Sequence, residues 1–413
     1  MTASAAVPAA VRVDQAFLPE LRRFGAFDID ACFNCGNCTA ICPLAVNGEA
    51  FPRRAIRYAQ VGMRDELLSS RELWLCYGCS ECSATCPRQA EPGEFMAAAR
   101  RYAIAAYDRT GLARLLYTRP AVGALAAILL AVVLALFMAG ARGPMPAERL
   151  ALFDWIPAEL VHNMGLAVII IVAIAGVAGL AAMFLRLARA RPGRATAPRP
   201  AAVGRALWSA IAVESLGQKR YREECESGSG TPAGSAAGVS AAGVSRDAVE
   251  EGLVPWYRRR WFVHATIMWG FLGLLAATML DYGLELTGIK PTGTPVPIWY
   301  PVRLLGTVAG ILLVYGTTVA IVRRLRRSDR YARHSQPSDW LFLALLWASG
   351  ASGFAIEAAL YLPDPPAWGY WVFLFHVAVA MELVLLAPFT KFAHAIYRPL
   401  ALLFRALNQV SPG

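Results

Sequence analysis

The sequence predicts an all-α protein that consists of a soluble N-terminal head followed by a bundle of six membrane-spanning helices. Hydrophobic residues make up 57% of the 413-residue chain, and several apolar runs reach the roughly 20 residues that a helix needs to cross a bilayer. The first hundred residues are more polar and hold eight of the nine cysteines. They begin with no basic, apolar, small-residue leader, so we expect the head to be made and kept in the cytoplasm.

Two cysteine runs dominate the head. The stretches CFNCGNCTAICP and CYGCSECSATCP both follow the pattern C-x2-C-x2-C-x3-C-P. This pattern is typical of bacterial ferredoxins, in which three thiolates of a run hold one 4Fe–4S cluster and the fourth ligates the other cluster. The rule predicts two clusters, each with ligands from both runs: Cys32, Cys35, Cys38 and Cys86 for the first, and Cys76, Cys79, Cys82 and Cys42 for the second.

Disulfide bonds and zinc are the alternative explanations for these cysteines. Disulfides are rare in a reducing cytoplasm. Zinc sites usually combine paired C-x2-C units rather than a duplicated run of four cysteines. The doubled motif therefore favours iron–sulfur clusters.

The head comprises residues 1–110, and outside the cysteine runs it is predicted to be helical. Residues 52–74, between the runs, place apolar side chains three and four positions apart, as an amphipathic helix does, and a second helix is expected over 93–107. This arrangement resembles the α-helical ferredoxin domain, which the small iron–sulfur subunit of heterodisulfide reductases shares with succinate dehydrogenase iron–sulfur subunits. The sequence lacks the CCG-type cysteine motif of heterodisulfide reduction, so we expect the substrate chemistry on another subunit.

Six apolar segments are predicted to span the membrane: 121–140, 160–185, 261–282, 304–322, 340–362 and 371–396. The first two belong to a segment over residues 115–186, and the other four belong to a segment over residues 261–397. Arginines follow spans two and four and precede span three, whereas the opposite loops hold few basic residues. The positive-inside rule therefore places the head and both termini, including a tail over 398–413, in the cytoplasm. This topology also explains the net charge of +11, so nucleic acid is not expected as a partner.

The long inner loop, residues 187–260, contains two contrasting segments. Residues 225–245 are rich in Gly, Ser and Ala, which predicts a flexible insertion without chemistry. Residues 206–225 look like an amphipathic helix that lies on the inner membrane surface or under the head. Cys225 belongs to neither cysteine run; a free thiol is the simple interpretation, and a redox or contact role is the alternative.

Four of the five histidines sort by membrane depth. His376 and His394 lie 18 residues apart in the last span, about five helical turns, so one helix would carry them on one face near opposite membrane surfaces. His264 lies near the inner end of span three and His162 near the outer end of span two. Because low-spin haem b iron takes one imidazole on each side of the porphyrin, we expect an inner haem between His264 and His394 and an outer haem between His162 and His376. Ordinary buried or interfacial histidines are the alternative.

The His-x17-His spacing of the last span resembles the cytochrome b subunit of respiratory nitrate reductase. That family places both partner histidines on one earlier helix, ten residues apart. Here Leu274 stands ten residues after His264. We therefore expect His162 to serve as the ligand that this position lacks.

A helical two-cluster ferredoxin domain fused to such a cytochrome b resembles, over essentially the full chain, the C component of the quinone-interacting membrane-bound oxidoreductase complex. In that family the fusion unites the C-like and E-like parts of heterodisulfide reductases. The resemblance implies a multi-pass protein of the bacterial inner membrane with A- and B-like flavin/iron–sulfur partner subunits in the cytoplasm. It also implies electron exchange between menaquinone and adenylylsulfate reductase in dissimilatory sulfur metabolism.

A quinone site needs groups that handle protons, and charged residues inside membrane spans are candidates because they are costly there. The candidates are Asp281, Glu285, Arg303 and Glu357 in the outer half, and Glu382 and Lys391 deeper in the last span. Structural ion pairs are the alternative explanation for each of them. Two other functions also stay open: the membrane subunit of a heterodisulfide-reductase-like or sulfite-reduction complex, and a haem-free anchor for a cytoplasmic enzyme.

Overall fold

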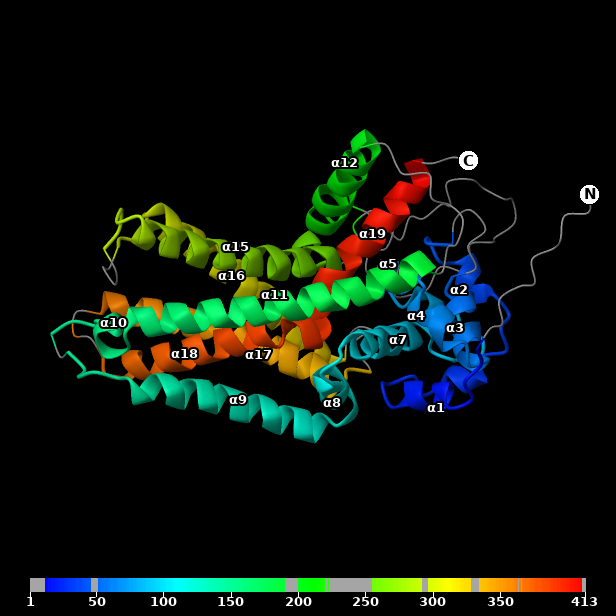
Figure 1. The fold of residues 1–413 in the computed structure, drawn as a ribbon, viewed down its shortest axis with the longest axis horizontal. Helices are drawn as coiled ribbons and strands as arrows, with labels where there is room; N and C mark the ends of the chain where they lie inside the picture. The colour runs from blue at the N-terminus through cyan, green and yellow to red at the C-terminus, as the bar shows by residue number, and fades with distance from the viewer. Residues whose placement is uncertain are drawn as a thin grey trace, which may run out of the picture.

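The computed structural model of the protein describes residues 12–45, 51–146, 148–189, 200–219, 222, 255–291, 296–327, 334–362, 364 and 366–410. Within these ranges the chain forms helices and turns but no β-strand, which confirms the all-α class. Figure 1 shows two parts arranged end to end. The short helices of the head gather at one end, and long helices run side by side away from it.

The head is built from short helices followed by one long helix: α1 (Phe17–Arg22), η1 (Ile29–Ala31), α2 (Asn37–Ala40), α3 (Arg53–Gln60), α4 (Arg64–Leu68), α5 (Glu72–Leu75), α6 (Glu81–Ala84) and α7 (Pro92–Tyr107). The segment between the cysteine runs thus forms three short helices, α3 to α5, instead of one. Gly62 separates α3 from α4 with a φ of +78°, a conformation that favours glycine. A Cβ at this position would lie only 2.5 Å from the carbonyl oxygen of Asp14.

The core of the head continues into the last helix of the chain, α19 (His394–Val410). Trp74 of α5 is 1% exposed, and its ring centroid lies 4.8 Å from that of Tyr397 in α19. Tyr107, at the end of α7, contacts the same tyrosine at 5.3 Å. These aromatic contacts fix the head on one end of the bundle.

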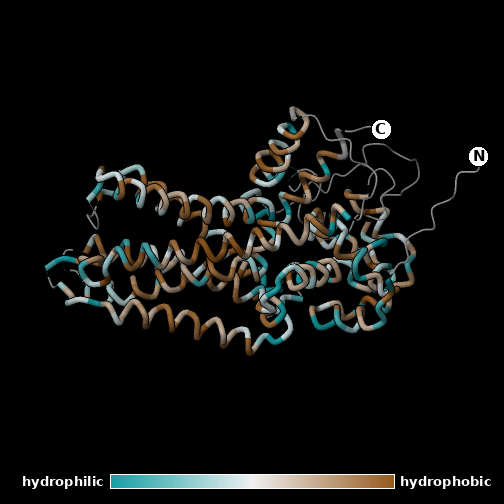
Figure 2. The backbone as a smooth tube through the Cα atoms, in the orientation of Figure 1, coloured by the Kyte–Doolittle hydropathy of each residue, from teal (hydrophilic) through white to brown (hydrophobic). Residues whose placement is uncertain are grey.

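Among the described residues, six helices are long and apolar enough to cross a membrane, as predicted: α9 (Pro120–Gly140), α11 (Ala158–Arg189), α15 (Arg260–Leu286), α16 (Pro301–Arg326), α17 (Pro337–Tyr361) and α18 (Trp368–Leu385). Three short helices precede long ones: α8 (Leu112–Thr118), α10 (Leu152–Trp155) and η5 (Trp256–Arg258). Figure 2 shows hydrophobic residues along most of the length of the long helices. Many of these side chains face outward; Ile174 and Val177, for example, are 65% and 66% exposed, as lipid-facing residues would be.

The long helices pack in sequence order. α15 packs on α16, α16 on α17, and α17 on α18, while α18 also contacts α9 and α11. The close approach of α15 and α16 depends on Gly270, where a Cβ would lie 2.6 Å from the backbone nitrogen of Leu313. The ring of His162 in α11 also reaches Tyr282 in α15, with 4.4 Å between ring centroids.

The last predicted span is not one continuous helix. α18 ends at Leu385, two 3-10 turns follow over Ala387–Phe389 and Lys391–Ala393, and α19 starts at His394. Pro388 explains the break, since proline lacks the backbone N–H of a helix interior and its ring disfavours helical geometry before it. The prediction that His376 and His394 share one face of one helix was therefore wrong. The segment predicted as a tail from residue 398 is helical through Val410.

The described part of the inner loop packs against α19. Residues Pro200–Trp208 form α12, which continues as a π-helix, η3, over Ser209–Leu216. Both helices contact α19, and Figure 1 shows α12 beside it. The predicted Gly/Ser/Ala insertion and Cys225 lie outside the described residues.

Candidate iron–sulfur and haem sites

The two cysteine runs adopt the same backbone conformation. Asn34 and Gly78, which occupy equivalent positions, have φ values of 65° and 71°, and the equivalent pair Gly36 and Ser80 have 91° and 65°. In each run, two residues in the left-handed backbone conformation stand at matching positions. They curve the backbone around a centre between the first three cysteines of the run. The short helices α2 and α6 follow one residue later and pack on each other.

The first-run thiols lie beside one cysteine of the second run. Cys38 is buried, and burial raises the pKa of its thiol above the usual value. Charged neighbours raise the pKa further, and Cys32, Cys35 and Cys86 are among them. Cys32, Cys35 and Cys86 are thus near enough to Cys38 for their charges to act on its thiol, and their joint ligation of the first cluster stays a prediction.

The remaining cysteines gather in the same crossed manner. Burial raises the pKa of the Cys42 thiol to about 12, and its charged neighbours are Cys76 and Cys79. Burial also raises the pKa of the Cys82 thiol, and the charges of Cys79, Cys76, Cys42 and Cys38 raise it further. The charges that act on Cys42 thus include those of two cysteines of the second run, and its ligation of the second cluster stays a prediction.

The chemistry of these donors fits iron–sulfur clusters. Thiols with raised pKa values lose their protons readily only beside a strong positive charge, which a cluster's iron ions supply. Within the described ranges, no three His, Cys, Asp or Glu side chains form a group that could hold a single metal ion. A 4Fe–4S cluster distributes its thiolates over four irons, so its ligands lie further apart than those of one zinc ion.

The two cysteine groups differ in their surroundings. Cys35 is exposed, and the neighbouring Phe33 is 61% exposed, so the first group reaches the surface of the head. The second group faces the membrane helices. Arg260, at the start of α15, donates a hydrogen bond to the carbonyl oxygen of Cys79 at 3.0 Å.

His264 and His394 meet at the inner end of the bundle. Their ring centroids are 6.1 Å apart, with 56° between the ring planes. Metal–imidazole bonds are about 2.0 Å long, so two imidazoles on opposite sides of one metal ion have centroids roughly 6 Å apart. The separation of these two rings therefore fits a bis-histidine iron site.

The hydrogen bonds of both rings set their tautomers. His264 Nδ1 lies 3.0 Å from Oε1 of Gln218, and His394 Nδ1 lies 2.6 Å from the carbonyl oxygen of Lys391. Both partners are acceptors, so each Nδ1 carries the proton and donates it. Nε2 is then the lone-pair nitrogen of each ring, the form in which imidazole binds a metal.

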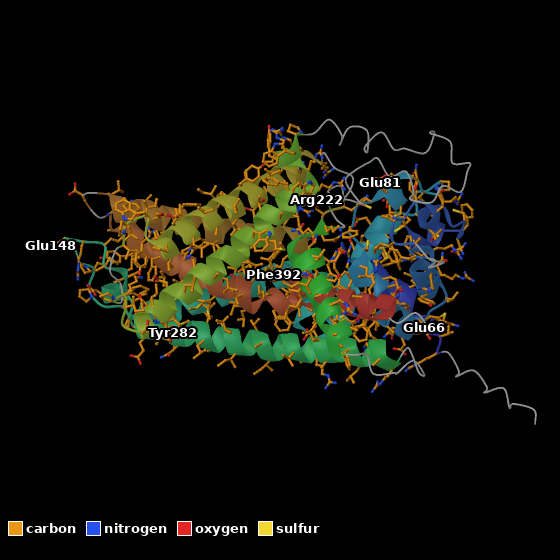
Figure 3. The ribbon with its side chains drawn as sticks, turned by 90° about the horizontal axis from the view of Figure 1, so that it is seen from above. Glu66, Glu81, Glu148, Arg222, Tyr282 and Phe392 are labelled. Atoms are coloured by element: carbon orange, nitrogen blue, oxygen red, sulfur yellow. The ribbon has the colours of Figure 1, made fainter. Side chains whose placement is uncertain are left out.

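The outer histidines have separate partners. His376 Nδ1 lies 3.0 Å from Ser352 Oγ, whose hydroxyl donates to the carbonyl oxygen of Ala348 at 2.6 Å. Ser352 therefore accepts from His376, and Nε2 of His376 is again the lone-pair nitrogen. His162 contacts α15 instead, with its Nε2 3.8 Å from Oε2 of Glu285. Figure 3 shows Tyr282, the ring partner of His162, at the end of the bundle far from Glu66 and Glu81 in the head.

Most of the charged quinone-site candidates form ion pairs. Asp281 pairs with Lys290 at 2.6 Å, and Lys290 lies 3.5 Å from Glu285. Arg303 pairs with Glu357 at 3.3 Å. These contacts agree with the structural alternative stated for each residue.

The two deeper candidates differ from each other. Lys391 pairs with Asp339 of α17 at 3.1 Å, which ties the break before α19 to the first turn of α17. Glu382 is 2% exposed, and its Oε1 has no hydrogen-bond partner among the described residues.

Several residues of these sites escaped the sequence analysis. Gln218 and Ser352 are far from their histidines in the sequence, and no local pattern connects them. Arg260 and Arg398 could have been found, because each stands four residues from a predicted haem ligand, on the same helix face.

Two protein-family models match the chain. The model described as a 4Fe-4S dicluster domain matches residues 28–90, which contain both cysteine runs. The model described as citrate utilization protein B matches residues 164–413, which include His264, His394, four of the candidate membrane helices of the described residues and most of a fifth, α11. No solved structure matches the chain.

Curated relatives match parts of the chain. The E component of dihydromethanophenazine:CoB–CoM heterodisulfide reductase from Methanosarcina mazei is 30% identical over 156 residues, 35% of this chain and 59% of the relative. Citrate utilization protein B of Escherichia coli is 31% identical over 152 residues, 37% of this chain and 38% of the relative. The C component of H(2):CoB–CoM heterodisulfide,ferredoxin reductase from Methanothermobacter thermautotrophicus is 35% identical over 63 residues, 15% of this chain and 34% of the relative. The chain thus spans from about a third to three fifths of the length of these relatives.

Proposed function

The chain belongs to the citrate utilization protein B family, whose model spans residues 164–413, and from this we propose that it is the membrane electron-transfer subunit of a quinone-interacting oxidoreductase complex. Electrons pass between menaquinone, two b haems, two 4Fe–4S clusters and soluble flavin/iron–sulfur partner subunits. The observation that carries the proposal is the position of the second cysteine group. It contacts α15 and α19, the two helices that bring His264 and His394 together.

Each cysteine group is assigned one position along this electron-transfer path. Cys32, Cys35, Cys38 and Cys86 hold the cluster next to the soluble partner, because this group reaches the surface of the head at Cys35. Cys76, Cys79, Cys82 and Cys42 hold the cluster next to the membrane. When bound, the clusters supply one-electron carriers, and the chain fixes their order between the partner and the bundle.

The histidines are assigned to two haems at different depths. His264 and His394 ligate the inner haem, supported by the 6.1 Å separation of their rings and by the acceptors on both Nδ1 atoms. His376 ligates the outer haem, supported by its hydrogen bond with Ser352. His162 remains the proposed second ligand of that haem; it lies at the same end of the bundle and must turn from Glu285 to bind iron.

The proposed identities of the quinone and of the partner subunits come from similarity to known proteins. The names of two relatives include a heterodisulfide reductase activity, and one also includes dihydromethanophenazine, which supports a membrane subunit that serves a multi-subunit oxidoreductase. Menaquinone, A- and B-like subunits and adenylylsulfate reductase are the proposed counterparts for this chain in a bacterial inner membrane. The head then lies in the cytoplasm, supported by the arginines at its end of the bundle.

Purification of the full chain with its native partners tests this proposal. The preparation should contain two b haems and two 4Fe–4S clusters, and a menaquinol analogue should exchange electrons with them. The copurified subunits then distinguish an adenylylsulfate reductase pathway from a heterodisulfide-reductase-like complex. Absence of the b-type absorption band after dithionite reduction would refute the proposal and favour a haem-free anchor.

A further inference from the structure

Three arginines bind the backbone of the second cysteine run. Arg100 Nη1 donates to the carbonyl oxygen of Cys76 at 3.0 Å, and Arg398 Nη1 reaches the same oxygen at 3.5 Å. Arg260 Nη1 donates to the carbonyl oxygen of Cys79 at 3.0 Å. All three side chains are half-buried, so solvent screens their charges only in part. The loop predicted to hold a cluster therefore lies among three positive charges.

These arginines come from different parts of the fold. Arg100 belongs to α7, inside the head. Arg260 is in α15, one turn before His264, and Arg398 is in α19, one turn after His394. Residues four apart lie on the same face of a helix. The two helices of the inner histidine pair thus each extend one arginine to the cysteine loop.

A second contact strengthens the connection through α19. The guanidinium carbon of Arg398 lies 4.5 Å from the ring centroid of Tyr77, the residue that follows Cys76. A cation over a tyrosine ring is attracted by its electron-rich face. Arg398 therefore holds both the backbone and a side chain of the loop between Cys76 and Cys79.

We propose that Arg260 and Arg398 are positioning residues that join the second cysteine group to the inner histidine pair and set the potential of its cluster. The proposal rests on the proposed function. The carbonyl contacts hold the loop at a fixed place against α15 and α19, so the distance for electron transfer is constant. Their positive charges favour the reduced, more negative cluster and raise its potential.

The step that they serve transfers one electron. The reduced cluster loses one electron, and ferric iron held by the inner histidines gains it to become ferrous. No bond forms or breaks, and no proton moves. Electron transfer slows steeply with distance, so a loop that moves away from α15 and α19 must transfer electrons more slowly.

Matched variants separate the effect of each arginine's charge on the cluster potential from its effect on the position of the cysteine loop. R260Q, R398Q and R100Q each remove one positive charge next to the same loop, but Arg100 connects the loop only to the head. R142Q removes an exposed charge two residues after the end of α9, and Figure 1 shows α9 running away from the head. R260K keeps the charge and loses the guanidinium geometry.

The experiment uses the purified full-length protein. EPR-monitored redox titration gives the potential of the second-run cluster, and freeze-quench EPR with optical detection follows electron transfer from that cluster to the haem after a menaquinone analogue is added. R260Q, R398Q and R100Q should lower the cluster potential, whereas R142Q and R260K should leave it unchanged. R260Q and R398Q should also slow the transfer, because the loop is no longer held against α15 and α19, whereas R100Q should not.

The direction of the two effects makes the test strict. A lower cluster potential by itself increases the driving force toward the haem. Because the charge of Arg398 also acts on His264 and His394, the haem potential is titrated in each variant as well, and slower transfer at an equal or larger driving force arises from lost positioning. Transfer at the normal rate in both variants, or equal slowing in R100Q, would overturn the inference. Iron and haem contents equal to those of the unaltered protein check that each variant is folded. A protein without haem would refute the proposed function itself, which is a separate outcome.

Discussion

The inner and outer histidine pairs occupy opposite ends of the same bundle but are organised differently. His264 and His394 face each other at 6.1 Å, and a carbonyl oxygen accepts from each Nδ1. At the outer end, His376 is held by Ser352, whereas His162 contacts Tyr282 and Glu285. The rings of the inner pair already have the separation of a bis-histidine iron site, whereas the proposed outer site requires His162 to change its contacts.

The difference follows from the chain near each pair. The break at Pro388 starts a new helix at His394, so this ring is directed independently of His376. Figure 3 shows Phe392, two residues before His394, between the head and the outer end marked by Tyr282. An interruption that looks unfavourable in a membrane span therefore lets the inner site form next to the head.

The largest expected effect is at the inner pair. His394→Ala should remove the inner haem, leave both clusters in place and block electron transfer between clusters and quinone, because the path loses its carrier next to the head. Pyridine haemochrome and iron assays measure the contents. His334→Ala, which changes a histidine just before α17 that belongs to neither pair, is the control and should keep both haems. Full haem content in His394→Ala would show that the inner pair is not a haem site.

The outer pair should respond more weakly. His376→Ala and His162→Ala should each remove the outer haem but keep the inner haem and its exchange with the clusters. Optical redox titration distinguishes the two haems by potential. Two haems in His162→Ala, with one in His376→Ala, would assign the outer ligand to another residue and leave His162 with Glu285.

Cys42 and Cys86, each proposed as a ligand of the other run's cluster, allow a similar comparison between the two clusters of the head. Cys42→Ser should alter the EPR signal of the cluster next to the inner pair, and Cys86→Ser should alter that of the exposed cluster. The reason is that Cys42 and Cys86 are each proposed to ligate the cluster of the other run, as their charge interactions with Cys76, Cys79 and Cys38 support. Each variant should retain the haems. The reverse assignment of the two signals would contradict the crossing.

The smallest effects are expected from the residues that hold the imidazoles. Gln218→Ala removes the acceptor of His264 Nδ1, and Ser352→Ala removes that of His376. Loss of such a partner typically lowers metal affinity about 10- to 100-fold, so each variant should lose haem more readily at its own depth. Haem retention during dilution into apomyoglobin measures this. Equal loss of both haems in one variant would count against two separate sites.

The sequence predicted the features that depend on local patterns. The cysteine runs carry their ligand spacing within twelve residues, and hydropathy alone identifies the spans because lipid requires long apolar helices. The depth of His264 and His394 followed from topology. Their meeting in the structure agrees with that prediction.

The break before His394 and the partners of the histidines could not be predicted in the same way. Proline is tolerated in many membrane helices, so Pro388 alone did not indicate a break. Gln218 reaches His264 from a loop 46 residues away, and Ser352 reaches His376 from another helix. Such contacts depend on how the helices pack, which a single sequence does not encode locally.

Reoxidation of reduced clusters by a menaquinone analogue tests the central claim most directly. The purified full-length protein and its His394→Ala variant are reduced by a low-potential donor, mixed with the analogue and frozen for EPR. We expect the cluster signals to disappear rapidly in the unaltered protein and to persist in the variant, because the inner pair carries the only proposed path between head and quinone. Equally rapid loss of the signals in both proteins would contradict the account.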